Sequence, residues 1–258
     1  MKQTERRKYL IEYLLSERQQ TAAIPSDMNG QRMLFRALVN VRMPKAASKE
    51  FLEIQDEYLQ EELHLKGITD IADLKSVALN LYLWQGDITT LKCDGIVNAA
   101  NSQMIGCFCP NHGCIDNAIH TFAGVQLRQE CAEIMKAQGK EENTGQAKIT
   151  KAYNLPCKYV LHTVGPIVYG ELTKQHEKQL SDCYRSCLTL ADKNGLQSIA
   201  FCCISTGEFH FPNERAAQIA IQTVNEYKHK TQSKIKVIFN VFKEYDHAIY
   251  ERLLTANK

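Results

Sequence analysis

The sequence contains no long apolar run and no large excess of charge of one sign. No stretch of its 258 residues approaches the roughly 20 apolar residues that a membrane-spanning helix needs. The first 20 residues carry charges throughout and lack the apolar core of a secretory signal peptide. The net charge of +2 is too small to indicate a surface for nucleic acid or for a membrane. We therefore expect a cytoplasmic protein whose partners include neither nucleic acid nor a membrane.

Internal repeats and low-complexity tracts are also missing, and the composition is that of an ordinary globular protein. Hydrophobic residues make up 44% of the chain and charged residues 23%, which permits a sizeable core. The ten cysteines would suggest disulfides only in a small secreted chain. Several of them, such as Cys202 and Cys203, lie in apolar runs, and we expect these to be buried thiols.

Residues 1–74 are predicted to form a helical extension. Apolar residues recur at helical spacing in residues 4–19, 33–41 and 48–65, and Ser48 is a candidate N-cap. Proline residues fall between these stretches, where helices should break. No motif in this region carries chemistry, so the pattern favours helices that pack on the main domain.

Residues 75–258 alternate between strand and helix patterns, which predicts an α/β sandwich with a mixed, largely buried sheet. Continuous apolar stretches, such as residues 199–204, are typical of strands that are covered on both faces. The predicted strands are residues 81–84, 95–99, 147–153, 159–164, 198–204 and 236–242, and the predicted helices are residues 116–122, 125–138, 175–194, 213–229 and 246–254.

Three strand ends carry unusual sequences, and ligands of open α/β sheets bind beyond such carboxyl ends. At the first, Asp87 either caps the following segment or accepts a hydrogen bond from an exocyclic amine such as that of adenine, and the spacing favours the cap. In residues 205–212, a strand runs into Ser-Thr-Gly before a helix. Gly207 permits close backbone approach, so the N–H groups of this loop can form an anion-binding nest. No lysine follows, which excludes a Walker-type loop, and an ordinary strand-to-helix turn is the alternative.

The strand end at Asn101 leads into a loop with closely spaced potential metal ligands. Cys107, His112 and Cys114 follow a C-x₄-H-x-C spacing, and thiolate and imidazole are the usual ligands of zinc. Three protein ligands would leave a position open for water or substrate, as in catalytic sites. A fourth ligand from Cys109 would instead make a closed structural site. A cysteine-rich loop without metal is the remaining alternative.

Asp116 and His120 lie in the predicted helix that follows this loop. An aspartate suits the positive end of a helix dipole, so a cap is one interpretation of Asp116. A carboxylate that faces the same pocket as the metal is the other. His120 lies about one helical turn further on, and a packed or hydrogen-bonded histidine is favoured there over one that faces the pocket.

In combination, these segments resemble the macrodomain family, whose members bind ADP-ribose. The resemblance covers about residues 75–258 and implies a three-layer α/β/α sandwich. The loop at residues 106–114 resembles that of the zinc-dependent bacterial subclass, in which a Cys…His-x-Cys motif binds zinc and an N-terminal helical extension is typical. The motifs that carry the resemblance are Gly86-Asp-Ile-Thr89, Val97-Asn-Ala-Ala-Asn101, Asp116-Asn-Ala-Ile-His120 with Ala123-Gly124, and Ser205-Thr-Gly207 with Phe211-Pro212.

The resemblance implies a role for each matching residue. Asp87 would bind the adenine amino group, and Ile88 would supply a neighbouring backbone N–H. Asn101 would contact the distal ribose and Asp116 would lie near it beside the zinc, which makes these two the candidate catalytic residues. Phe242 is expected to stack on adenine. A set of loop residues would wrap the diphosphate and the distal ribose, mainly through backbone N–H groups: Ser205, Thr206, Gly207, Glu208 and Phe209.

Glu208 and His210 depart from the family pattern, because many macrodomains have an apolar residue and a glycine at these positions. A carboxylate beside a diphosphate is unfavourable. Glu208 is therefore expected to face the substrate protein or the reacting ribose.

Similar members of this subclass are protein ADP-ribosyl hydrolases, associated with sirtuin-type ADP-ribosyltransferases and lipoyl-carrier proteins. The resemblance thus implies a zinc-dependent hydrolase of the glycosidase class that removes mono-ADP-ribose from Asp or Glu side chains of modified proteins. The alternatives are a reader that binds ADP-ribose without cleaving it and a hydrolase of small ADP-ribose derivatives.

Overall fold

The computed structural model describes residues 1–255, and a seven-stranded mixed sheet forms the centre of the fold. The strand order is β2-β3-β9-β8-β5-β7-β6. The five inner strands run parallel, whereas β2 and β6 at the two edges are antiparallel to their neighbours. The strands are β2 (Ser76–Ala78), β3 (Leu81–Gln85), β9 (Lys236–Val241), β8 (Ser198–Phe201), β5 (Gly95–Ala100), β7 (Tyr159–Val164) and β6 (Ala147–Lys151).

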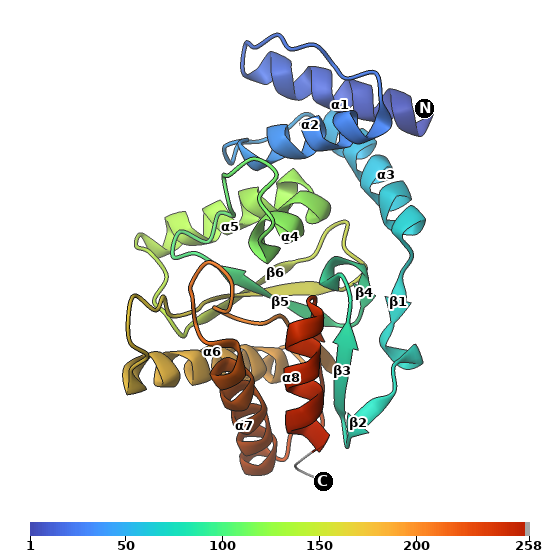
Figure 1. The fold of residues 1–258 in the computed structure, drawn as a ribbon. Helices are drawn as coiled ribbons and strands as arrows, with labels where there is room; N and C mark the ends of the chain where they lie inside the picture. The colour runs from blue at the N-terminus through green and yellow to red at the C-terminus, as the bar shows by residue number, and fades with distance from the viewer. Residues whose placement is uncertain (256–258) are drawn as a thin grey trace.

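Helices cover both faces of this sheet, so the expected three-layer α/β/α sandwich is confirmed (Figure 1). One face is covered by α4 (Ile115–Ala123) and α5 (Val125–Gln138). The other is covered by α6 (Lys174–Lys193), α7 (Asn213–Thr231) and α8 (Glu244–Thr255). Every residue of β8 is buried between the two layers, which explains its continuous apolar sequence. Within residues 1–255, no helix combines the length and the apolar character that crossing a membrane requires.

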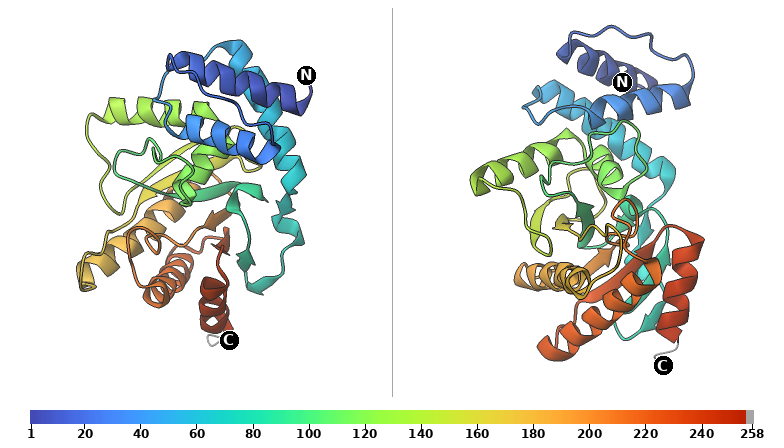
Figure 2. Two further views of the ribbon diagram at one scale, coloured as in Figure 1. Left: turned by 45° about the horizontal axis from the view of Figure 1, so that its top comes forward. Right: turned by 60° about the vertical axis from the view of Figure 1, so that its left-hand side comes forward.

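Three N-terminal helices form a second apolar cluster, which lies beyond α4 and α5 (Figure 2). They are α1 (Gln3–Glu17), α2 (Met28–Asn40) and α3 (Lys49–Lys66), so each predicted helix of the extension is present. Ser48 caps α3 as predicted, because its hydroxyl accepts a hydrogen bond from the N–H of Phe51 (3.1 Å). The cluster includes Leu10, Ile11, Leu14, Phe35, Phe51 and Tyr58.

Two features depart from the predicted pattern. A short strand, β1 (Thr69–Asp70), lies at the end of the predicted extension and pairs with β4 (Leu91–Lys92), and β2 joins the main sheet. Strands of two or three residues are too short to show the alternation from which strands are predicted. In addition, β8 ends at Phe201, three residues before the predicted end of the strand at residue 204. The run continues because Cys202 and Ile204 stay buried in the core after the chain leaves the sheet.

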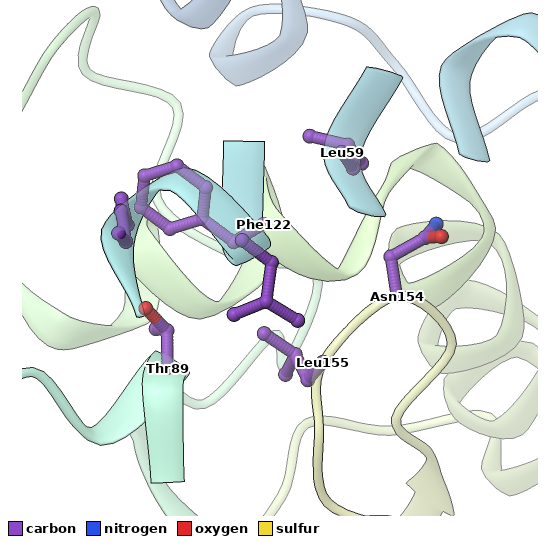
Figure 3. Close-up of a pocket in the computed structure, with 7 residues that line it drawn as sticks. Leu59, Thr89, Phe122, Asn154 and Leu155 are labelled. Atoms are coloured by element: carbon purple, nitrogen blue, oxygen red, sulfur yellow. The ribbon is translucent and has the colours of Figure 1, made fainter. Parts of the chain in front are cut away.

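The α3 helix joins the sandwich through a buried glutamine. Gln55 is fully buried, and its Oε1 accepts a hydrogen bond from the N–H of Val125 (3.0 Å). Gly124 permits this approach, because a Cβ there would lie 2.6 Å from Gln55 Nε2. A small pocket also lies between α3 and the sandwich (Figure 3). Its apolar lining consists of Leu59, Leu63, Phe122 and Leu155.

Replacing Gln55 by Met should therefore destabilise the protein. The buried N–H of Val125 would lose its acceptor, which costs about 1–3 kcal/mol in the free energy of unfolding. Urea denaturation measures this loss. Gln222→Met, at an exposed position of α7, is the matched control and should change stability by less than about 0.5 kcal/mol. Equal stabilities of the two variants would show that this hydrogen bond does not hold α3 to the sandwich.

Candidate functional site

The carboxyl ends of four neighbouring parallel strands meet at one edge of the sheet, and a predicted site residue follows each of them. Asp87 follows β3, and Phe242, which is largely exposed, follows β9. The loop at residues 205–212 follows β8, and Asn101 follows β5. The topology therefore brings together segments that lie far apart in the sequence, at the place where α/β sheets bind ligands.

Asp87 is a cap, as its spacing favoured. Its Oδ1 accepts hydrogen bonds from the N–H of Thr89 (3.0 Å) and from the hydroxyl of Thr89 (2.6 Å), which caps the short 3₁₀ helix Ile88–Thr90. Its Oδ2 lies 3.3 Å from Nζ of Lys66, the last residue of α3. The same Nζ lies 3.3 Å from the centroid of the Phe122 ring. Because a carboxylate oxygen has two lone pairs, Oδ2 retains capacity for a further donor.

The loop at residues 205–212 is closed by its own backbone. Ser205 and His210 adopt positive φ angles of 65° and 55°, and the N–H of Phe211 donates to the carbonyl of Ser205 (2.9 Å). Within residues 1–255, the N–H groups of Gly207, Glu208 and Phe209 donate to no protein acceptor. Consecutive free N–H groups on a tight loop form a site for an anion.

A close approach to another loop sets the position of this one. A Cβ at Gly165 would clash with the side-chain oxygen of Ser205, so the two segments pack together only with glycine at position 165. The Oγ of Ser205 is buried and, in the described part of the chain, has no hydrogen-bond partner. The hydroxyl therefore has a donor and an acceptor that no described protein group uses.

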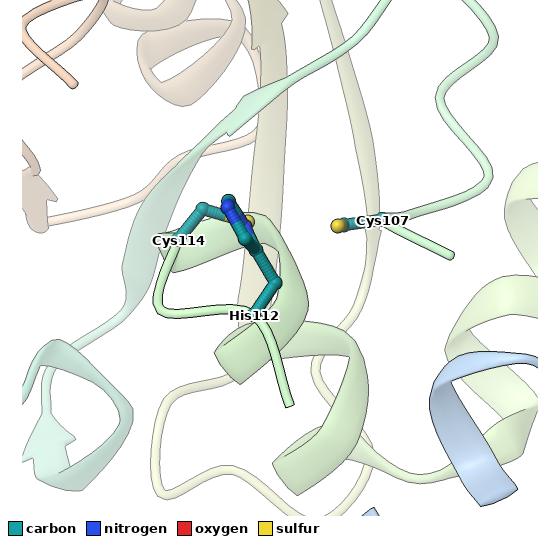
Figure 4. Close-up of side chains that lie close together, drawn as sticks. All are labelled: Cys107, His112 and Cys114. Atoms are coloured by element: carbon teal, nitrogen blue, oxygen red, sulfur yellow. The ribbon is translucent and has the colours of Figure 1, made fainter. Parts of the chain in front are cut away.

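The loop after β5 brings three potential metal ligands together. The Sγ atoms of Cys107 and Cys114 and a ring nitrogen of His112 all lie within 4.8 Å of one another, and Figure 4 shows Cys107 approaching from a separate arm of the loop. The Nδ1 of His112 is buried without a hydrogen-bond partner in the described residues. Burial raises the pKa of the Cys114 thiol to about 12, so a thiolate there needs a compensating positive charge. Two sulfurs and an imidazole fit a thiophilic divalent ion such as zinc.

Cys109 lies outside this group, and its side chain is exposed. Among residues 1–255, only its carbonyl oxygen is hydrogen-bonded, to the N–H of His112 (3.3 Å) and to Nδ2 of Asn117 (3.0 Å). The geometry thus favours three protein ligands and an open position over a closed site.

Glu208 connects the loop that carries Cys107, His112 and Cys114 (the metal-ligand loop) to the loop at residues 205–212 (the anion-binding loop). Its Oε1 lies 3.5 Å from Nε2 of His112, and its side chain is 71% exposed. The carboxylate consequently points along the surface toward His112.

Asp116 is not the helix cap. Cys114 holds that position, because its Sγ accepts a hydrogen bond from the N–H of Asn117 (3.4 Å). Asp116 is buried, and its Oδ1 accepts a hydrogen bond from Nδ2 of Asn98 (2.8 Å). Burial raises the pKa of Asp116 to about 6, against the lowering effects of Asn98 and of the Arg128 charge. The sequence singled out Asn101, which follows β5, whereas the support that Asn98 of β5 gives to Asp116 was missed.

A second cluster of histidine and cysteine, His120, Cys131 and His162, lies in the core. Both ring nitrogens of His162 have hydrogen-bond partners: Nδ1 is 3.1 Å from Asn98 Nδ2, and Nε2 is 2.9 Å from Thr150 Oγ1. Burial lowers the pKa of His120 well below its usual value, so its ring is neutral. The side chain is buried, so His120 is a packed histidine, as favoured from the sequence, and its Nε2 lies 3.5 Å from Oδ1 of Asp116.

The side chain of Asn101 organises the start of the metal-ligand loop. Its Oδ1 accepts hydrogen bonds from the N–H groups of Gln103 and Met104 (both 3.1 Å), and its Nδ2 donates to the carbonyl of Gly106 (3.2 Å). An amide nitrogen has two hydrogens, so Asn101 keeps one donor for a ligand.

Comparison with known proteins identifies the family. A sequence model of the Macro domain family matches residues 97–220. A protein-ADP-ribose hydrolase of Treponema medium is 58% identical over an alignment that spans 99% of this chain and 100% of that protein. The chain belongs to the Macro domain family. A protein-ADP-ribose hydrolase of Staphylococcus aureus strain MSSA476 is 49% identical, across 95% of this chain and 94% of that protein.

Solved structures agree with this assignment. The Trypanosoma brucei macrodomain in complex with ADP-ribose superposes with a TM-score of 0.66 and 33% identity, over 85% of this chain and 94% of that one. The Oceanobacillus iheyensis macrodomain with ADP gives a TM-score of 0.63 and 34% identity, over 71% of this chain and 95% of that one.

The metal-ligand group leads to a prediction with a built-in control. Cys107→Ser should abolish stoichiometric zinc binding, because one of three closely spaced donors is lost. Cys109→Ser should retain about one zinc per chain, because that thiol lies outside the group. Elemental analysis of dialysed protein measures both. Loss of zinc from Cys109→Ser as well would establish a fourth thiolate ligand.

Proposed function

We propose that this protein is a zinc-dependent hydrolase that removes mono-ADP-ribose from modified protein side chains. The observation that carries the proposal is the contact between His112 and Glu208, which places the metal-ligand group directly beside the anion-binding loop. The relatives from T. medium and S. aureus bear the name protein-ADP-ribose hydrolase, and the T. brucei macrodomain binds ADP-ribose.

ADP-ribose would lie along the edge formed by the four strand ends. Asp87 would accept a hydrogen bond from the adenine amino group, beside the N–H of Ile88, and Phe242 would stack on the base. The free N–H groups of the loop would bind the diphosphate, which is what unpaired consecutive donors favour. Asn101 would use its remaining hydrogen on the distal ribose. The loop residues involved would be Ser205, Thr206, Gly207, Glu208 and Phe209.

Cys107, His112 and Cys114 would hold zinc. When bound, zinc supplies a Lewis acid that polarises an ester oxygen or orients the hydroxyls of the distal ribose.

The reaction would break the bond between C1″ of the distal ribose and a carboxylate oxygen of a modified Asp or Glu. Water would supply the hydroxyl on C1″ and release its other proton to solvent, and the carboxylate of the Asp or Glu side chain would leave. Positive charge develops on the ribose in such a cleavage, and the carboxylate of Asp116 would stabilise it. Asn98 would hold Asp116 in place through its 2.8 Å hydrogen bond.

The proposal for the substrate protein rests only on the resemblance of the loop at residues 106–114 to that of the zinc-dependent bacterial subclass. On that basis, a lipoyl-carrier protein modified by a sirtuin-type transferase is the candidate.

Asp116→Asn tests the proposed catalytic role. Loss of the charge should slow release of ADP-ribose from a protein mono-ADP-ribosylated on acidic side chains by at least about 100-fold. Affinity for free ADP-ribose, measured by calorimetry, should change little, because the diphosphate and adenine contacts remain. Asp73→Asn, at an exposed position outside the site, should match the wild type.

Two outcomes would contradict the proposal. A wild-type protein that binds ADP-ribose but releases none from the modified protein would be a reader. Turnover confined to small compounds, such as acetylated ADP-ribose, would make it a hydrolase of small ADP-ribose derivatives.

A further inference from the structure

The metal-ligand loop has no regular structure of its own. Between Asn101 and Ile115 the chain forms neither helix nor strand, and three of its residues, Met104, Gly106 and Asn111, have positive φ angles of 58°, 85° and 54°. Ordering such a segment costs conformational entropy, which contacts with other elements must offset. The three ligand atoms nevertheless lie within 4.8 Å of one another.

The α2 helix of the N-terminal extension supplies one set of these contacts. The Nη2 of Arg36 donates to the carbonyl of His112 (2.9 Å). Its Nε and Nη2 also donate to Oδ1 of Asn117, at 3.0 and 2.7 Å. Asn117 in turn donates its Nδ2 to the carbonyl of Cys109 and its backbone N–H to Sγ of Cys114. One guanidinium thus fixes the backbone of one proposed ligand directly and reaches a second through a single residue.

The carboxyl end of α2 supplies a second set. Asn40 is fully buried, and its Oδ1 accepts a hydrogen bond from the N–H of Asn111 (2.9 Å), the residue next to His112. Arg128 of α5 donates to the carbonyls of Asn40 (2.7 Å) and Arg42 (2.6 Å) and also to the carbonyl of Cys107 (3.3 Å). Both arms of the loop are consequently tied to the end of α2.

We propose that α2 is an integral part of the metal centre and that Arg36 and Asn40 are positioning residues, which set the affinity for zinc by holding the backbone of His112 and of its neighbour Asn111. This inference rests on the zinc site of the proposed function. It assigns a role to the extension, in which the sequence showed no chemistry. Residues that orient metal ligands commonly change metal affinity by 10–100-fold when they are replaced.

The same helix offers a matched control. Arg32 lies one turn before Arg36, and its guanidinium pairs with Glu62 of α3 (2.8 Å), within the extension. Arg32→Met and Arg36→Met therefore remove the same chemical group from the same helix. Only the second removes a contact with the metal-ligand loop.

The experiment compares full-length wild type, Arg32→Met, Arg36→Met and Arg36→Lys. Zinc dissociation constants come from competition with a chromogenic chelator, and the absorption of the cobalt-substituted protein reports ligand geometry. Thermal unfolding of the metal-free proteins reports stability. We expect Arg36→Met to raise the zinc dissociation constant by about 10–100-fold and to alter the cobalt spectrum. Arg36→Lys should restore part of the affinity, because an ammonium reaches one acceptor but lacks the planar fork.

Arg32→Met should leave the zinc dissociation constant within about two-fold of the wild type, even where it lowers the unfolding temperature. An unchanged dissociation constant and cobalt spectrum in Arg36→Met would overturn the inference and leave the proposed function intact. Equal weakening of zinc binding in Arg32→Met and Arg36→Met would also overturn it, because the effect would then reflect the general stability of the protein. A wild type that binds no zinc would overturn both the inference and the zinc site of the proposed function.

Discussion

Anchoring of the irregular segment between Asn101 and Ile115 is the constraint on which the candidate site depends. This segment must bring two sulfurs and an imidazole together without the support of a helix or strand. Asn101 fixes its start, the cap at Cys114 fixes its end, and α2 with Arg128 fixes its middle. Each anchor comes from a different element, so the geometry of the ligands exists only in the assembled fold.

The parallel sheet imposes the second constraint. Because β3, β9, β8 and β5 are neighbours and run in the same direction, their carboxyl ends place an acidic side chain, an exposed aromatic ring, an anion-binding loop and the metal-ligand loop along one edge. The contact between Glu208 and His112 joins the anion-binding loop to the metal-ligand loop.

The sequence predicted the sandwich, the helices and the grouping of Cys107, His112 and Cys114, because each has a local signal. Periodicity identifies helices and strands, and close spacing identifies ligands. Roles that depend on long-range contacts had no such signal. Arg36 lies 81 residues before Asn117 and Lys66 lies 21 before Asp87, and both look like ordinary surface residues of amphipathic helices.

Competition for the N-terminal cap of α4 explains why Asp116 is not the helix cap. Asp116 is a common type of capping residue, yet Cys114 takes that position because its thiol reaches the N–H of Asn117. The carboxylate is left buried, where it accepts a hydrogen bond from Asn98 instead of capping the helix end.

The most direct test measures release of ADP-ribose from a protein modified on acidic side chains before metal removal, after complete removal by a chelator, and after addition of zinc. Our account predicts that release stops when elemental analysis shows no remaining metal and returns when zinc is added. Release that continues unchanged in the metal-free protein would contradict it, and any metal held by the loop would then be structural.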